Sequence, residues 1–119
     1  GIKSGEQAET IRALPFEQEA ARAVRGTLAY FQACAVGPPY VCFLTLIGVK
    51  GFELNVGPGK FDSQYRIDRE VLQLPEIICD EPDADIFAVL RPAFDVLWQS
   101  AGHDRCLDYD EHGDWRSHW

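Results

Sequence analysis

One apolar stretch, PPYVCFLTLIGVKGFELNV over residues 38–56, constrains the fold more than any other part of this chain. Residues 40–47 are rich in aromatic and β-branched side chains and are almost continuously apolar. This composition predicts a strand that is covered on both faces or lies at the centre of a sheet. The alternating pattern that follows predicts a second strand up to Val56. Gly48 and Lys50–Gly51 then form either a tight hairpin turn or a bulge in one long strand, and we favour the hairpin.

Two amphipathic helices are predicted, one on each side of these strands in the sequence. The first runs over residues 15–35. Pro15 suits a first helical turn, and Gly37 and Pro38 end the helical pattern. Glu17 and Glu19 fall near its N-terminus, where the helix dipole favours negative charge. Its apolar residues recur every three or four positions and are Phe16, Ala20, Ala23, Val24, Thr27, Phe31 and Cys34.

The second helix lies within residues 81–102, EPDADIFAVLRPAFDVLWQSAG. Asp83 is predicted to cap its N-terminus and Gly102 to end it. Pro92 removes one backbone hydrogen bond inside the helix, so we expect a kink near residues 90–91. The helix carries an unbroken apolar stripe of Ile86, Val89, Leu90, Ala93, Phe94, Leu97 and Trp98.

The order of elements predicts the α+β class. Residues 67–72 are expected to form a turn and residues 74–79 a third strand. We predict a small antiparallel sheet of three to four strands, with the two main helices packed on one face. Residues 1–14 are expected to be a flexible lead-in, and residues 15–119 to form a single domain. Because the chain contains no methionine, we expect it to be a fragment of a larger protein.

Composition disfavours several classes of function. Hydrophobic residues make up 46% of the 119 residues, which supports a packed core rather than disorder. The net charge of −8 disfavours direct binding of nucleic acid and of anionic membrane surfaces. No apolar run has the length of a membrane-spanning helix. The four cysteines have no CxxC spacing, which indicates buried thiols and a cytoplasmic location.

Potential metal ligands gather only in the C-terminal tail, and these are His103, Cys106, Asp108, Asp110, His112 and His118. Zinc sites in proteins use Cys and His in closely spaced pairs, and the tail has no such pair. The pattern therefore predicts a solvated tail rather than a metal site. We predict no cofactor and no catalytic residue, and the sequence favours a chain that is not an enzyme.

Aromatic residues and one arginine suggest two alternative sites. Trp98 belongs to the stripe of the second helix and is predicted to lie in the core. Large aromatic side chains anchor protein interfaces, and the candidates here are Tyr40, Phe43, Trp115 and Trp119. Trp115 and Trp119 would either fold back onto the domain or dock onto a neighbour. The alternative is a pocket between sheet and helices near Tyr40, where Tyr65, Arg91 and Trp98 bind an anion or nucleotide.

Four segments together carry a family resemblance: VGPPYVCFLTLIGVKGFEL, YRIDREVLQLPEI, ADIFAVLRPAFDVLWQSAG and CLDYDEHGDW. In this order and spacing, over residues 15–116, the chain resembles the C-terminal region of bacterial proteins whose N-terminal half is a Schlafen AlbA-type domain. Those proteins are described as ATP-binding or DNA-binding proteins and as transcriptional regulators. The resemblance implies that the AlbA-type domain carries any nucleotide or nucleic-acid site.

Two functional hypotheses follow. In the first, the chain is a non-catalytic accessory or oligomerisation domain that packs against the AlbA-type domain or forms a homodimer. This hypothesis predicts self-association or an exposed apolar patch. In the second, the chain is a sensing domain for a small anion or nucleotide.

Overall fold

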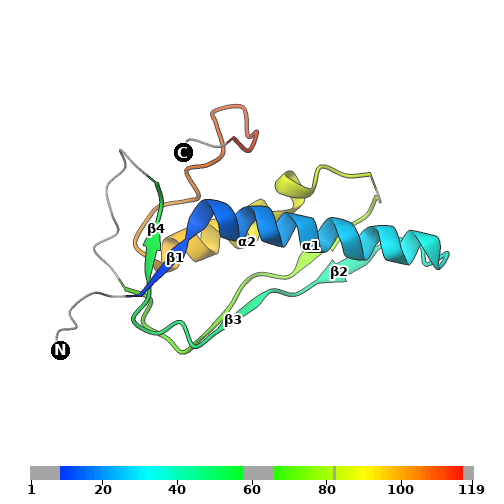
Figure 1. Ribbon diagram of the computed structural model, residues 1–119. Helices are drawn as coiled ribbons and strands as arrows, with labels where there is room; N and C mark the ends of the chain where they lie inside the picture. The colour runs from blue at the N-terminus through cyan, green and yellow to red at the C-terminus, as the bar shows by residue number, and fades with distance from the viewer. Residues whose placement is uncertain (1–8, 58–65, 82, 117–119) are drawn as a thin grey trace.

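The computed structural model describes residues 9–57, 66–81 and 83–116, and within these ranges the chain has an α+β fold (Figure 1). Two helices are present, α1 (Ala13–Ala33) and α2 (Ile86–Ser100). The strands are short and are β1 (Thr10–Arg12), β2 (Tyr40–Cys42), β3 (Thr45–Ile47), β4 (Glu53–Asn55), β5 (Val71–Gln73) and β6 (Ile77–Cys79). The α+β class predicted from the sequence is confirmed.

A long two-stranded antiparallel ribbon forms the main sheet layer. Strand β2 pairs with β6, and β3 pairs with β5, so that residues 40–47 run alongside residues 71–79. Between the two ladders, residues 43–44 lie opposite residues 74–76, and the Leu74 N–H donates to the Leu44 carbonyl at 2.9 Å. The extra residue on one strand is a bulge, which bends a ribbon without ending it. We call this unit the ribbon.

The hairpin predicted within residues 40–56 is wrong. Strand β3 pairs with β5, whereas β4 pairs in parallel with β1 and leaves the ribbon. The predicted turn does form, because the Phe52 N–H donates to the Val49 carbonyl at 3.0 Å. Gly51 has a φ of 87°, in the left-handed region that favours glycine. The local sequence thus specifies the turn. The strand that pairs with β3, however, is β5, which lies more than twenty residues further along the chain.

The segment before α1 is more ordered than the sequence indicated. Residues 10–12, expected in the lead-in, form β1, and α1 begins at Ala13 rather than at Pro15. Ala13 and Leu14 are buried. Residues 71 and 72, expected in a turn, belong to β5. In both places, pairing with a distant strand stabilises a conformation that the local residues favour only weakly.

Helix α1 ends two residues earlier than predicted, through backbone hydrogen bonds rather than through Gly37 and Pro38. The Ala35 N–H donates to the Gln32 carbonyl at 3.0 Å, and the Val36 N–H donates to the Phe31 carbonyl at 2.8 Å. This is the Schellman arrangement, which requires a left-handed residue after the cap. Ala35 occupies that position with a φ of 60°.

Helix α2 agrees closely with its sequence pattern. It is capped by Asp85 rather than Asp83, since the Asp85 Oδ1 accepts from the Phe87 N–H at 3.1 Å. The helix continues through Pro92 and ends before Gly102, which has the expected positive φ of 96°. The predicted stripe is buried except for Val89, which is half-buried.

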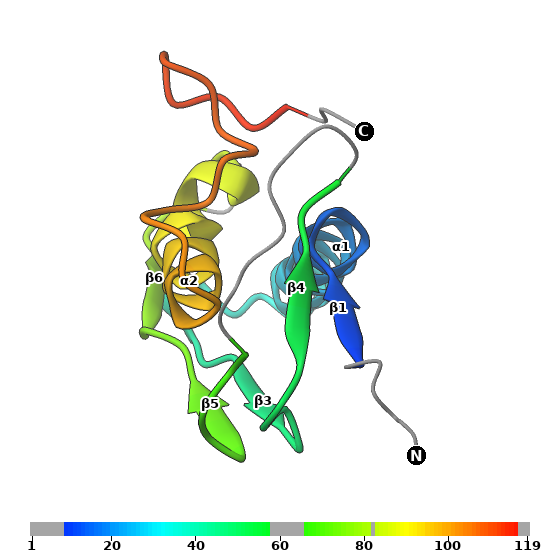
Figure 2. The ribbon, with the colours of Figure 1, turned by 90° about the vertical axis from the view of Figure 1, so that its left-hand side faces the viewer.

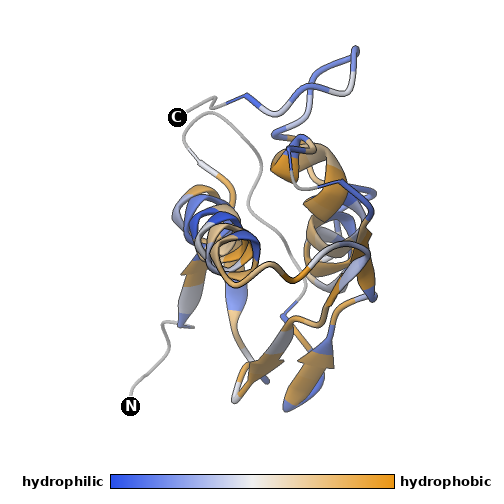
Figure 3. Cartoon of the chain, turned by 90° about the vertical axis from the view of Figure 1, so that its right-hand side faces the viewer, coloured by the Kyte–Doolittle hydropathy of each residue, from blue (hydrophilic) through white to orange (hydrophobic). Residues whose placement is uncertain are grey.

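Both helices lie side by side on one side of the ribbon (Figures 2 and 3), as predicted. The inward-facing ribbon residues belong to the same core as the α2 stripe, and they are Tyr40, Leu72, Leu74, Ile77 and Cys79. In the part of the chain that the structure describes, the strands form three two-stranded ladders rather than one wider sheet. No helix of the described residues lies over the other side of the ribbon (Figures 2 and 3).

We expect Ala35→Gly to raise the free energy of unfolding by about 0.5–1 kcal/mol, measured by urea denaturation. Glycine adopts the left-handed conformation without the cost that a Cβ atom imposes, although its unfolded chain has more entropy. Ala33→Gly is the matched control, because Ala33 is exposed and lies in the last helical turn. That change should lower stability by up to about 1 kcal/mol. Equal losses from both changes would contradict the assignment of strain to Ala35.

Candidate functional site

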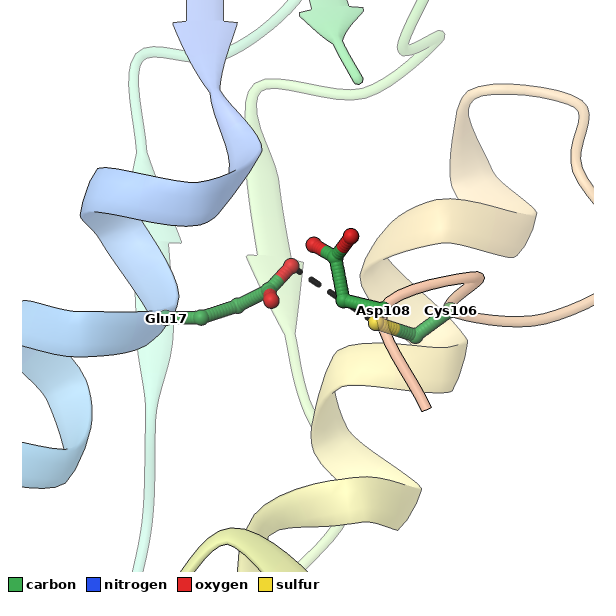
Figure 4. Close-up of side chains that lie close together, drawn as sticks. All are labelled: Glu17, Cys106 and Asp108. Carbon is green, nitrogen blue, oxygen red and sulfur yellow. Dashed lines mark hydrogen bonds between the residues drawn. The ribbon is translucent and has the colours of Figure 1, made fainter. Parts of the chain in front are cut away.

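The carboxyl group of Glu17 is buried where the two helices and the C-terminal tail meet (Figure 4). Trp98 of α2 donates its indole N–H to the Glu17 Oε2 at 3.0 Å. Trp115 of the tail donates its indole N–H to the Glu17 Oε1 at 2.8 Å. Each carboxyl oxygen therefore accepts a hydrogen bond from a different part of the fold.

Two further tail residues complete this site. Cys106 and Asp108 are fully buried, and the Cys106 thiol lies 3.6 Å from the Glu17 Oε2 (Figure 4). The thiol and one oxygen of each carboxyl group all lie within 4.8 Å of one another. We call Glu17, Trp98, Cys106, Asp108 and Trp115 the Glu17 cluster.

Backbone contacts hold the tail residues of the cluster in place. The Cys106 N–H donates to the Asp95 Oδ1 of α2 at 2.8 Å. The Arg116 N–H donates to the Asp108 carbonyl at 2.7 Å, which brings the two arms of the tail together. The Tyr109 hydroxyl donates to the Phe87 carbonyl at the start of α2. The tail is thus fixed to α2 on both sides of Asp108.

Burial and a neighbouring carboxyl group change the proton affinity of the cluster. Burial raises the pKa of Glu17 to about 8, and a hydrogen bond with Asp108 and its negative charge act in the same direction. The two indole N–H groups lower this pKa by a smaller amount. Burial also raises the pKa of the Cys106 thiol. Glu17 therefore holds a proton at neutral pH, next to a second carboxyl group.

The surroundings of the Glu17 carboxyl group favour a bound proton over a metal ion. Metal ligands must be deprotonated, whereas the surroundings of Glu17 and Cys106 favour their protonated forms. Both Glu17 oxygens also face N–H groups, whose positive ends oppose a cation. Since the side chains of Glu17, Cys106 and Asp108 are fully buried, they also lack contact with a substrate from solvent. The hydrogen bonds of the cluster hold the tail against the two helices.

The burial of two cluster residues, Glu17 and Asp108, differs from what the sequence predicts. The sequence places Glu17 near the N-terminus of a helix, where the dipole favours its charge, and predicts a solvated tail for Asp108, but both side chains are fully buried. The spacing contained one signal for Glu17, which lies four residues after Ala13 and three before Ala20, both of them buried. No local pattern indicated Asp108, because its burial depends on tail docking. Of the other suggested tail ligands, His112 is exposed, and His118 lies outside the described residues.

The residues of the predicted anion pocket are not brought together. Trp98 is fully buried, as expected for a core residue, and bonds to Glu17 near the start of α1. Tyr40 stacks on Phe31, fourteen residues or about 21 Å further along that helix. Tyr65 lies outside the described residues.

Arg91 packs against the tail instead of pointing into that pocket. Its guanidinium carbon lies 4.9 Å from the centre of the Tyr109 ring. Its Nε lies 3.9 Å from the Asp95 Oδ2, one turn further along α2. The cation thus rests on an aromatic ring of the tail, where it helps to hold the tail on α2.

The predicted interface residues also separate. Tyr40 is only 8% exposed, so it belongs to the core rather than to the surface. Trp115 folds back onto the domain and stacks on Phe87 with ring centres 4.1 Å apart. Trp119 lies outside the described residues. Phe43 is exposed on the uncovered side of the ribbon.

Phe43 is part of an apolar surface on that side, which we call the outer ribbon face. Its members are 52% to 78% exposed and are Val41, Phe43, Ile47, Val71 and Ile78. They alternate along each strand with more buried residues of the inner face. Within the described residues the helices cover one face of residues 40–47, and the cover expected on the other face stays a prediction. Figure 3 shows the strands of the ribbon as strongly hydrophobic.

Comparison with known proteins gives no relative, since no protein family, no curated protein and no solved structure matches the chain. The helices in the described ranges lack the length and apolar character needed to cross a membrane. All four cysteines are free thiols, and Cys79 and Cys106 are buried.

The raised pKa of Glu17 predicts that stability falls as the pH rises between about pH 5 and about pH 8. In this window the unfolded chain releases the Glu17 proton while the folded chain retains it, so alkali favours unfolding. The loss is up to about 1.4 kcal/mol for each pH unit and ends above the folded pKa. Urea denaturation at several pH values measures it.

Glu17→Gln is the matched variant for this measurement, because its amide has a similar shape and does not titrate. We expect the variant to show a much smaller change in stability over the same pH range. If the free energy of unfolding of Glu17→Gln changes with pH as steeply as that of the wild type, other groups cause the pH dependence. Asp110 is no such group, since its pKa is lowered by the Asp114 N–H and it titrates in more acidic solution.

Proposed function

We propose that this chain is a non-catalytic assembly domain, and that two copies associate through the outer ribbon face. The observation that carries the proposal is the row of exposed apolar side chains on that face. Together the five side chains expose on the order of 500 Å², as much as the largest apolar patch on a typical monomer. Patches of this size are often functional.

The arrangement of the patch suits a two-fold contact. Val41 lies directly opposite Ile78 at one end of the ribbon, and Ile47 lies directly opposite Val71 at the other end. In a two-fold dimer the first pair of one copy meets the second pair of the other, and all four side chains are branched aliphatics. Phe43 lies between the two pairs, near the proposed axis, and the exposed polar pair Thr45 and Gln73 separates it from Ile47 and Val71. Two copies would bury about 1,000 Å² of patch, which reaches the lower range of specific interfaces.

Charge favours a second copy at this face over other faces. The chain carries a net charge of −8, so two copies repel each other over most of their surfaces. Residues 40–47 contain no charged side chain, and residues 71–79 contain only Glu76. A contact through this face therefore brings together one charged ribbon side chain from each copy, the exposed Glu76.

The family resemblance suggests which larger protein such a dimer would belong to. In a cytoplasmic bacterial regulator with an AlbA-type domain, a dimer of this region would hold two AlbA-type domains near each other. Nucleic-acid contact would then belong to those domains, in agreement with the acidic character of this region. The Glu17 cluster, whose carboxyl and thiol groups are buried, supports a structural rather than a catalytic role.

Light scattering coupled to size-exclusion chromatography, over a range of protein concentrations, tests the proposal. We expect twice the mass of one chain for the wild type. Phe43→Thr and Ile47→Thr together should raise the dissociation constant at least tenfold, because they remove large apolar groups, while threonine suits an extended backbone. Tyr30→Gln is the matched control, since Tyr30 is exposed on α1, away from the ribbon.

A wild-type chain that stays monomeric, or a dimer insensitive to the ribbon substitutions, would contradict the proposal. If the ribbon amides of a monomeric chain gain protection from hydrogen exchange only when an AlbA-type domain is attached, that domain covers the face instead. Melting temperatures of the variants verify that the fold is retained.

A further inference from the structure

An open pocket lies between α1, the start of α2 and the tail, at a distance in the fold from the outer ribbon face. Its volume is about 680 Å³, and it is lined by Gln18, Arg22, Arg25, Gly26, Phe87 and Trp115. It has none of the residues of the anion pocket that the sequence suggested. The lining combines two cationic side chains with two aromatic rings in a chain whose net charge is −8.

The aromatic part of the pocket is held in a fixed arrangement. The Phe87 and Trp115 rings stack nearly parallel, with an angle of 14° between them. The Trp115 indole N–H is held by the buried Glu17 carboxyl at 2.8 Å. The Arg25 guanidinium carbon lies 5.3 Å from the centre of the Phe87 ring. A flat aromatic wall therefore stands beside a cation, and the tail bonds keep it in place.

The cationic part comes from one face of α1. Arg22 and Arg25 follow Gln18 by four and seven residues, a spacing that places all three on the same side of a helix. Arg22 has Glu19 as a neighbour at 3.1 Å, but both side chains are mostly exposed and such pairs are weak. An anion with two or three oxygens can therefore compete for Arg22 while it contacts Arg25.

Gly26 is an unusual residue for this wall. It lies in the interior of α1, where glycine is less favourable than alanine. A Cβ atom at this position would meet nothing within 4 Å, so neighbouring packing does not require glycine. Its absent side chain leaves the helix backbone open to the pocket, which is a recognised use of glycine at ligand sites.

We infer that this pocket binds a planar anion of the nucleoside monophosphate class. The base stacks against the Trp115 wall, and the phosphate lies between Arg22 and Arg25. Stacking on aromatic rings and contact with guanidinium groups are the usual means of holding such ligands. A free mononucleotide fits better than a polynucleotide, since the net charge of −8 opposes a long phosphate backbone.

Isothermal titration calorimetry with AMP, adenosine and inorganic phosphate tests the inference on the full chain. We expect AMP to bind at least about tenfold more tightly than adenosine or phosphate, because it alone uses both parts of the pocket. Arg25→Gln should weaken AMP binding about tenfold and leave adenosine binding nearly unchanged. Failure of AMP to bind at about 5 mM would overturn the inference.

Gly26→Leu and Gly26→Ala form a matched pair of variants. Together they distinguish a loss of AMP binding caused by a filled pocket from one caused by a loss of folding. Leucine and alanine both favour a helix, so both variants should melt at or above the temperature of the wild type. The leucine side chain should occupy the pocket and weaken AMP binding at least about tenfold, whereas alanine should change it by less than about threefold. AMP binding that Gly26→Leu leaves intact, or binding of a single-stranded oligonucleotide in preference to AMP, would overturn the inference.

Discussion

The hydrogen bonds from two indole N–H groups to the Glu17 carboxyl are the contacts on which the arrangement of this fold depends. They join α1, α2 and the tail at one buried point. A buried carboxyl group is costly unless its oxygens are hydrogen-bonded, and a buried indole N–H has the same requirement. Each partner therefore satisfies a need of the other, and removing one leaves polar groups without partners in the core.

The position of the helices and the exposure of the ribbon are two consequences of the same arrangement. Because the cluster fixes α1 against α2, both helices cover the same side of the ribbon, and the other side stays uncovered. Figures 1 and 2 show the ribbon on one side of the helices and the tail on the other. A dimer through the outer ribbon face would therefore leave the pocket beside Trp115 open. Assembly and ligand binding, as proposed, use different sides of the molecule.

The parts of the fold that the sequence predicted correctly are those set by local patterns. The apolar stripe of α2, its end at Gly102 and the turn before Phe52 each depend on neighbouring residues. Pairing of β3 with β5 and of β1 with β4 was missed, because many strand registers are compatible with short apolar segments. Residues 40–47 are suited to two-sided cover, yet the described residues cover only one face, and the sequence does not reveal what covers the other.

The candidate sites were harder to predict for a related reason. Glu17 lies at a core position of α1, but acidic residues near a helix N-terminus are ordinarily explained by the helix dipole. Its true environment depends on Trp98 and Trp115, which are more than eighty residues away. The pocket likewise joins α1 to Phe87 and Trp115, so no single segment carries its pattern.

The choice of a carboxyl group at position 17 has a specific structural effect. An apolar side chain there would fill the same space, but it would leave both indole N–H groups unsatisfied, at about 1–3 kcal/mol each. Trp115 would then lack the hydrogen bond that holds its ring in the stack on Phe87. The buried acid thus fixes the orientation of two rings as well as their position. Since one of these rings forms the wall of the pocket, the polar core of this domain determines the shape of its surface.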